Sequence, residues 1–233
     1  DGCMWEICRF QDGLDLYLNT RFDSVKTDGD TIKSITAKGL TNETYYTFSA
    51  PLFVDATGDG MLGALSGAEF MYGREAKSDF NETIPPDVAD KKTMGMSCLF
   101  QIRETDHPVP YTPPAWAYKY ESDEDLPYKD HRKKYNNNFW WIEVGGEWDC
   151  IHDSDRCREE LLKICYGVWD HMKNHGDHGM ENWELEWIGF LPGKRESRRY
   201  IGKYIVNQND VEAAGHFLAV LPQTAQIVML RVG

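Results

Sequence analysis

Three glycines spaced as G-x-G-x-x-G follow an apolar run in the segment FVDATGDGMLG, residues 53–63. Gly58 and Gly60 lack a Cβ atom, so the backbone can turn sharply there and a ligand can approach it closely. The amides that open a following helix favour an anion or hydroxyl oxygens, and Asp59 could cap that helix or accept a ligand hydroxyl. The pattern predicts a strand, a tight turn and a helix.

The segment does not fit the first turn of a Rossmann dinucleotide-binding unit. Such a unit places an acidic residue at the end of a second strand, about 20 residues after the glycines. Residues 75–92 contain no apolar strand, so Glu75 and Asp79 do not stand at a strand end. On spacing alone, a structural strand–turn–helix is the preferred interpretation.

A basic segment, GKRESRR at residues 193–199, surrounds Glu196 in an otherwise acidic chain. Arginine forks bind carboxylates and phosphates bidentately, so Arg195 and Arg199 could clamp such an anion while Glu196 orients an arginine. The alternative is a set of ion pairs with the abundant surface acids.

The histidines in HMKNHGDH have i, i+4, i+7 spacing: His171, His175 and His178. Two histidines one helical turn apart can bind a metal. Gly176 is expected to end the helix between them, and the sequence indicates no third ligand. We therefore expect a solvated helix end and no metal.

Aromatic and sulfur-containing residues offer two weaker signals. Trp140 and Trp141 would lie on opposite faces of a strand, so one of them could stack on a sugar ring while the other is core. The cysteines are scattered, with no C-x-x-C, and we expect free thiols rather than a disulfide framework. Nothing marks Cys98 as an activated thiolate.

Composition excludes several classes of protein. The chain has 233 residues, and its formal net charge of −13 argues against a nucleic-acid partner and against adhesion to anionic membranes. No apolar run is long enough to cross a membrane, and no signal peptide is visible at the start of the sequence. The compartment is not readable from the sequence.

The expected elements are mostly short strands. Residues 14–57 predict a small antiparallel meander, beginning with a strand at 14–18 and including a hairpin turn at TDGD, and a buried strand then leads into the glycines. Helical character is expected after the glycines over 61–75, and the clearest helix is expected over 153–176, capped by Asp153 or Ser154. Further strands are expected at 94–105, 139–146 and 181–193.

Several of these stretches together resemble a known family. FVDATGDG is similar to the second flavin-contacting segment of FAD-dependent oxidoreductases, and GKRESRRYIGKYIVNQND, LYLNTRFDSV and WDHMKNH with ELEWIGF occur in matching order. From about residue 5 to residue 211, the chain resembles the bacterial FAD-dependent oxidoreductase family whose members often carry a xanthan lyase label.

The resemblance implies an α/β (α+β) fold: part of a glutathione-reductase-like FAD-binding domain with an inserted α+β substrate domain. Residues 1–74 would belong to the FAD-binding domain, 75–190 to the inserted domain, and 191–233 to a segment returning toward the flavin. The family's N-terminal G-x-G-x-x-G would precede Asp1, and the tail at 212–233 departs from the family pattern. We therefore expect a fragment that is inactive alone.

The resemblance also implies residue roles. Ala56, Thr57, Gly58, Asp59 and Gly60 would contact FAD, and Arg195 and Arg199 would bind a flavin or substrate anion. The expected function is hydride transfer between an organic substrate and the flavin; no catalytic base can be named, and homo-oligomerisation stays open. The alternatives are a non-catalytic carbohydrate-binding module and an inactive truncated chain.

Overall fold

The computed structural model describes residues 2–127, 131, 141–202, 204–213 and 227–228. The chain divides into two compact units, one formed by Asp1–Met71 with Arg198–Gly233 and the other by Tyr72–Ser197. The sequence analysis placed boundaries after residues 74 and 190, and its assignment of the parts to FAD and substrate domains remains a prediction. Helices and strands are mixed in both units, as expected for an α+β protein.

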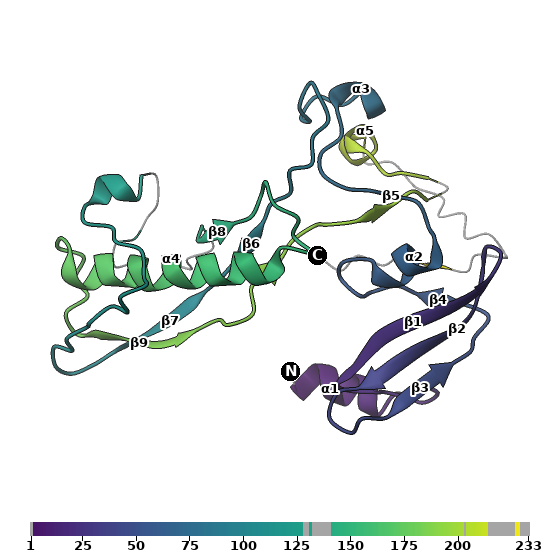
Figure 1. Cartoon of the computed structure of the whole chain (residues 1–233), viewed down its shortest axis with the longest axis horizontal. Helices are drawn as coiled ribbons and strands as arrows, with labels where there is room; N and C mark the ends of the chain where they lie inside the picture. Colours follow the sequence, from purple (N-terminus) through teal and green to yellow (C-terminus); the bar gives the residue numbers. More distant parts are fainter. Residues whose placement is uncertain (1, 128–130, 132–140, 203, 214–226, 229–233) are drawn as a thin grey trace. The chain divides into compact units, whose positions relative to one another are not determined.

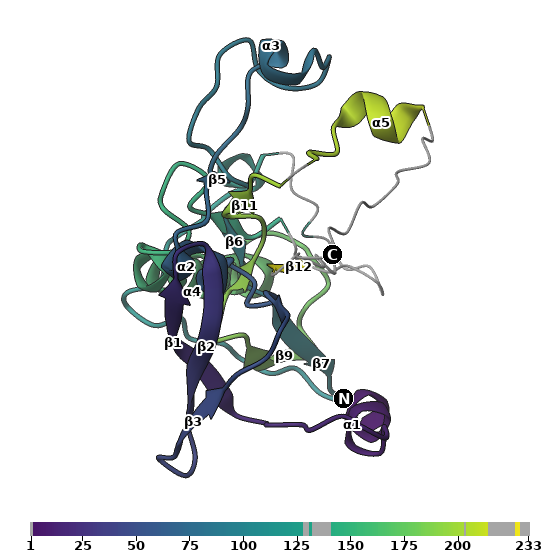
Figure 2. The same cartoon turned by 90° about the vertical axis from the view of Figure 1, so that its right-hand side faces the viewer.

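The first unit contains the predicted meander. Strands β1 (Thr20–Asp28), β2 (Thr31–Gly39) and β3 (Tyr45–Phe48) form an antiparallel sheet in that order, with Gly29 in the turn at a φ of +57° (Figure 2). Ile32 of β2 packs with Phe53 and Leu62 in a small buried core. This core holds the strand–turn–helix segment against the sheet.

The remaining elements of the first unit are short. They are α1 (Gly2–Arg9), β4 (Phe53–Val54), α2 (Met61–Ser66), β5 (Phe70–Met71), β11 (Arg199–Tyr200), α5 (Gln208–Glu212) and β12 (Ile227–Val228). β12 pairs with β4 in parallel, and β11 pairs with β5 antiparallel. The chain therefore returns to the glycine segment after residue 198.

Two expectations for this unit are wrong. Residues 14–18 form no strand; Tyr17 instead packs edge-on against Tyr46 and Phe48, with ring centroids 5.2 and 5.0 Å apart. The helix after the glycines ends at Ser66 rather than continuing to residue 75. Gly67 stops it with a φ of +87° and donates its amide to the carbonyl of Ala64, which is a usual way for helices to end.

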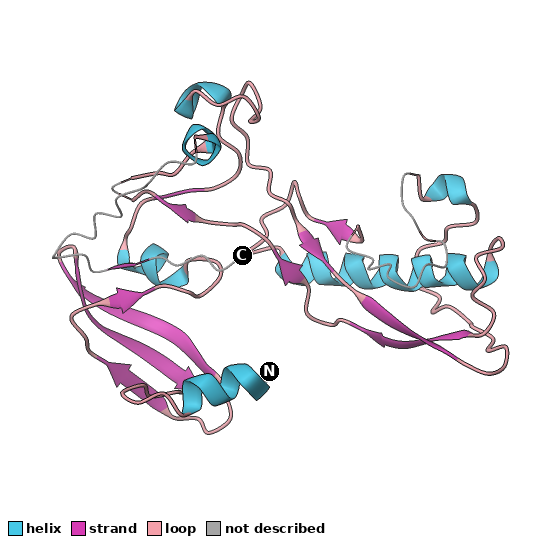
Figure 3. Cartoon of the chain, turned by 180° about the vertical axis from the view of Figure 1, so that it is seen from behind, coloured by secondary structure: helices cyan, strands magenta, loops and turns pink. Residues whose placement is uncertain are grey.

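The second unit is built around α4 (Ser154–Asn174), which matches the helix expected over 153–176. Figures 1 and 3 show it beside β7 (Phe100–Glu104) and β9 (Trp183–Ile188), which pair antiparallel. Its buried face follows helical spacing: Leu161, Cys165, Val168 and Met172 are each at most 1 % exposed. Asp153 precedes the helix, but its carboxylate accepts the amide of Asp149 rather than capping α4.

The other elements of this unit are α3 (Lys77–Phe80), β6 (Met96–Ser97), the 3-10 helix η1 (Asp123–Asp125), β8 (Glu143–Val144) and β10 (Gly193–Lys194). The single strand expected over 94–105 is divided, because β6 pairs with β8 and β10 whereas β7 pairs with β9. Of the strand expected over 139–146, the structure describes residues 141–146, and within them β8 is the part that forms a strand. Trp140 lies outside the described residues, as does most of the tail at 212–233.

Candidate functional site

The turn after β4 is held by one buried carboxylate. Oδ1 of Asp55 accepts the amide of Thr57 at 3.0 Å and its hydroxyl at 2.7 Å, and Oδ2 accepts the amide of Gly63 at 2.9 Å. Asp55 is 6 % exposed, and burial by itself would raise its pKa. These hydrogen bonds, with a further one from Tyr200, outweigh that cost and hold the pKa of Asp55 below its usual value. The carboxylate therefore fixes both ends of the turn.

The helix after the turn is capped by Thr57. Its Oγ1 accepts the amide of Met61 at 2.7 Å, and Gly60, at the N-cap position, has a φ of +64° and no side chain to contribute. The expectation that Asp59 could cap this helix is wrong, because Thr57 already stands one turn before the first amides. Asp59 is half-buried, and its carbonyl accepts a hydrogen bond from Nη1 of Arg198 at 3.3 Å.

The side chain of Tyr200 leaves no room for a Cβ atom at two of the three glycine positions. Its hydroxyl accepts the amide of Ala64 at 3.0 Å, lies 3.1 Å from Oδ2 of Asp55 and contacts the carbonyl of Gly60. A Cβ on Gly60 would lie 2.7 Å from this hydroxyl, and one on Gly63 would lie 2.3 Å from Cζ of the ring. Side chains at either position would displace the tyrosine.

Gly58 has a different environment. Its φ is +85°, and no atom of the described residues lies within 4 Å of the place that a Cβ would take. Ala56, Thr57 and Gly58 are exposed, while Asp59 and Gly60 are intermediate. The outer side of the turn is thus open to close approach by a ligand.

The amides of α2 are not open in the same way. Those of Met61, Gly63 and Ala64 are bonded to Thr57, Asp55 and Tyr200, respectively. The expectation that amides at the start of this helix face an anion is therefore not met at these three positions. The exposed backbone of the turn is the part that could meet a cofactor.

The two predicted arginines lie in different units. Arg199 belongs to β11, pairs with Met71 in the first unit and is half-buried, whereas Arg195 is exposed in the second unit. Oε1 of Glu196 accepts the amide of Met94 at 2.8 Å, which gives this carboxylate a backbone partner. The anion-binding roles of Arg195 and Arg199 remain predictions.

Sequence reasoning missed the two residues that organise the turn. Asp55 carried a usable signal, because an acid placed directly after a buried apolar strand needs hydrogen-bond donors nearby. Tyr200 had no such signal, since it lies 145 residues from Asp55 in the sequence. Burial and the nearby charge of Asp55 raise the pKa of Tyr200 to about 12, so its hydroxyl stays protonated at neutral pH.

A family model described as FAD dependent oxidoreductase matches residues 3–221, nearly the whole chain. The chain belongs to this family. This FAD dependent oxidoreductase is accordingly a flavoprotein with FAD as its cofactor and a redox function. No curated protein and no solved structure matches it.

The described residues of the oxidoreductase fit the flavin in part. The open turn at 56–58 offers exposed backbone for a close contact, whereas three of the amides in the first turn of α2, which could otherwise face a phosphate, are already engaged. Among the residues that the structure describes, no helix is long and apolar enough to cross a membrane.

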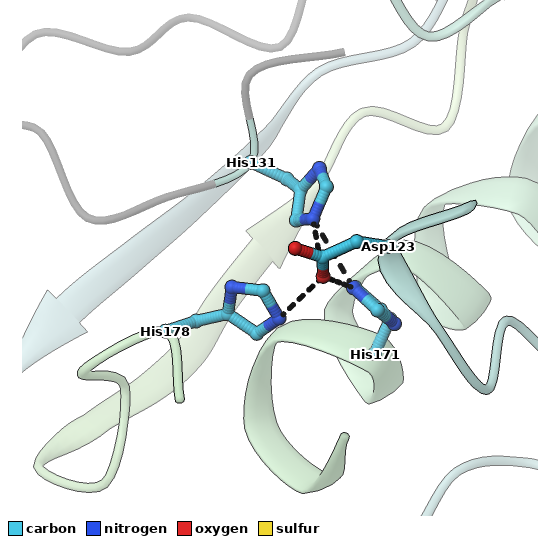
Figure 4. A group of neighbouring side chains, drawn as sticks. All are labelled: Asp123, His131, His171 and His178. Atoms are coloured by element: carbon cyan, nitrogen blue, oxygen red, sulfur yellow. Dashed lines mark hydrogen bonds and ion pairs between the residues drawn. The ribbon is translucent and has the colours of Figure 1, made fainter. Parts of the chain in front are cut away.

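The histidines singled out in the sequence separate into two environments, both in the second unit. Nε2 of His175 lies 3.5 Å from Oδ2 of Asp170. His171 and His178 instead meet Asp123 and His131, two residues that the sequence did not connect with them (Figure 4).

Proposed function

We propose that this FAD dependent oxidoreductase places the turn Ala56–Gly60 against the flavin and transfers hydride between an organic substrate and that cofactor. The bound flavin ring would supply the hydride chemistry. The observation that carries the proposal is the open, preorganised turn, which Asp55 holds from behind through three hydrogen bonds to Thr57 and Gly63. A turn already fixed before binding loses little conformational freedom when a ligand meets it.

The contact would be made by backbone rather than by the Thr57 side chain. Oγ1 of Thr57 already donates to Asp55 and accepts from Met61, so its role is to shape the turn. The exposed peptide groups of Ala56, Thr57 and Gly58 would meet the flavin, and the Asp59 carboxylate would accept a hydrogen bond from one of the cofactor's hydroxyl groups.

The phosphates of FAD would be held by groups other than the α2 amides. Three of those amides are satisfied within the protein, and taking the Gly63 amide from Asp55 would leave a buried carboxylate short of a partner. We therefore propose that the chain by itself binds FAD weakly and is inactive alone. Arg199 and Arg195 would contribute positive charge toward a flavin or substrate anion.

Flavin titration of the chain tests this division of roles. Fluorescence quenching of FAD and of riboflavin should give weak and similar affinities, because the chain would recognise the part that the two molecules share. Binding of FAD at least about 100-fold tighter than riboflavin, a difference of roughly 2.7 kcal/mol, would contradict the proposal that this chain holds the phosphates of FAD only weakly.

A matched pair of variants tests the turn. Ala56→Glu adds bulk and charge on the exposed turn and should abolish flavin quenching. Ala50→Glu makes the same change at an exposed position before β4 and should leave quenching unchanged. Equal flavin binding by both variants would overturn the placement of the turn against the flavin.

A further inference from the structure

Three buried histidines and one carboxylate converge on a single point in the second unit. Asp123 lies on η1, His131 follows it in the chain, His171 lies on the last turns of α4, and His178 follows that helix (Figure 4). One ligand atom from each lies within 4.8 Å of every other. We propose that these four residues bind a divalent transition-metal ion, with Zn²⁺ the best match to the donor set.

The distances fit a tetrahedral ion. Zn²⁺ bonds of about 2.0–2.1 Å at tetrahedral angles place neighbouring ligand atoms about 3.3–3.4 Å apart. Oδ1 of Asp123 lies 3.2, 3.3 and 3.5 Å from the Nε2 atoms of His171, His131 and His178. The Nε2 atoms of His171 and His131 are 3.2 Å apart. These four of the six separations already match what the ion requires, and the distances from Nε2 of His178 to the other two histidines are bounded only by the 4.8 Å limit.

The hydrogen bonding of His171 prepares it as a ligand. Its Nδ1 lies 2.9 Å from the carbonyl oxygen of Tyr120, which can only accept, so Nδ1 carries the proton. With the proton on Nδ1, Nε2 is the nitrogen that can bind a metal, and it lies 3.2 Å from Oδ1 of Asp123. A backbone carbonyl is one of the usual outer partners of a ligating histidine in metal sites.

His178 gives an independent indication. Its side chain is 4 % exposed, and within the described residues neither ring nitrogen meets the geometry of a hydrogen bond, although Nε2 lies 3.5 Å from Oδ1 of Asp123. Buried polar atoms in folded proteins nearly always have a hydrogen-bond or metal partner. The buried His178 imidazole faces a group of potential metal ligands, so a bound ion is a suitable partner for it. Such an ion would bind at Nε2.

The site would be structural. Four protein ligands fill a tetrahedral shell, whereas catalytic zinc sites keep one position for water or substrate. The ion would tie Asp123 and His131 to the C-terminal end of α4. The expectation of no metal rested on the end of the helix near Gly176 and on the lack of a third ligand in the sequence nearby. Asp123 and His131, which are distant in the sequence, lie beside His171 and His178 and could provide further ligands. This proposal does not depend on the flavin.

Metal binding by the whole chain is the test. After removal of metal with a chelator, the protein should take up one Zn²⁺ per chain, measured by elemental analysis and by competition with a chromophoric chelator. Co²⁺ should bind at the same stoichiometry and give the intense visible absorption of a tetrahedral complex. Failure of the chain to bind one Zn²⁺ would overturn the proposal.

Three variants locate the site. His178→Ala and the isosteric Asp123→Asn should each weaken Zn²⁺ binding at least about 100-fold. Mutating even a residue that only hydrogen-bonds to a metal ligand typically lowers metal affinity about 10–100-fold. Asp123 is 53 % exposed, so its amide variant should fold even if His178→Ala does not. His175→Ala, on the same helix end but outside the cluster, should bind as the wild type does. Zn²⁺ binding unchanged in Asp123→Asn, or weakened equally in His175→Ala, would contradict the assignment.

Discussion

The hydroxyl of Tyr200 lies 3.1 Å from Oδ2 of Asp55, and this contact joins residues 145 positions apart in the sequence. It ties β11 to the turn after β4, because Asp55 also binds the amides of Thr57 and Gly63. The turn that we propose to meet the flavin is therefore held partly by a residue from the far end of the chain.

Removing the Tyr200 hydroxyl should destabilise the first unit. Tyr200→Phe keeps the ring that packs against Gly63 but removes the hydrogen bonds to Asp55 and Ala64. Hydrogen bonds to charged groups contribute about 1.5–3 kcal/mol, so the free energy of unfolding should fall by about 2 kcal/mol. Urea denaturation followed by circular dichroism measures this change.

Tyr45→Phe provides the control, because Tyr45 is 59 % exposed on β3 of the same unit. Its free energy of unfolding should stay within about 0.5 kcal/mol of the wild type. Equal stability of the two variants would show that the Tyr200 hydroxyl does not hold the turn.

Asp55 should make stability depend on pH in the acidic range. Its pKa is lower in the folded protein than its usual value, so its contribution is fully present above the pKa of the unfolded chain. That contribution is lost as the pH falls through the folded-state pKa. As the pH is lowered from about 5, the free energy of unfolding should therefore fall more steeply for the wild type than for Asp55→Asn. Parallel pH profiles for the two proteins would exclude this role.

A glycine in the middle of α4 should resist replacement. Alanine is about 1 kcal/mol better than glycine inside a helix, so Gly167→Ala would stabilise an isolated α4. In the protein, however, the new Cβ would lie 2.3 Å from the carbonyl oxygen of Tyr118. We expect a net loss of about 1–3 kcal/mol in the free energy of unfolding, as for other overpacked sites.

The control for this variant is Glu159→Ala, on the exposed side of the same helix, where the carboxylate is 66 % exposed. It should change the free energy of unfolding by less than about 0.5 kcal/mol. A Gly167→Ala protein more stable than the wild type would show that the segment at Tyr118 does not pack closely on α4.

The cysteines should react in two classes. All six are free, and Cys3 and Cys8 are the ones not buried. Thiolate is the reactive form, and burial raises the pKa of the Cys157 thiol. A thiol-reactive disulfide reagent should therefore label two cysteines quickly in the native protein and all six in denaturant. Rapid native labelling of more than two would contradict the burial of the four in the second unit: Cys98, Cys150, Cys157 and Cys165.

Local patterns in the sequence predicted those elements whose signals are local. The apolar spacing of α4 and the turn at Gly29 were sufficient, because helix periodicity and turn chemistry act over a few residues. The same reasoning failed at residues 14–18, where Tyr17 makes ring contacts to β3 instead of strand hydrogen bonds. It also extended α2 past Gly67, whose left-handed conformation ends the helix.

The sequence by itself determined the family, through segments such as DATGDG and GKRESRR, and the existence of a glycine turn. Only the tertiary structure decided that Tyr200 requires Gly60 and Gly63, and that His131 and Asp123 meet His171 and His178. The physical reason is that hydrogen bonds and metal ligation depend on distance in space. Residues far apart in the sequence become neighbours only when hydrophobic burial packs their elements together.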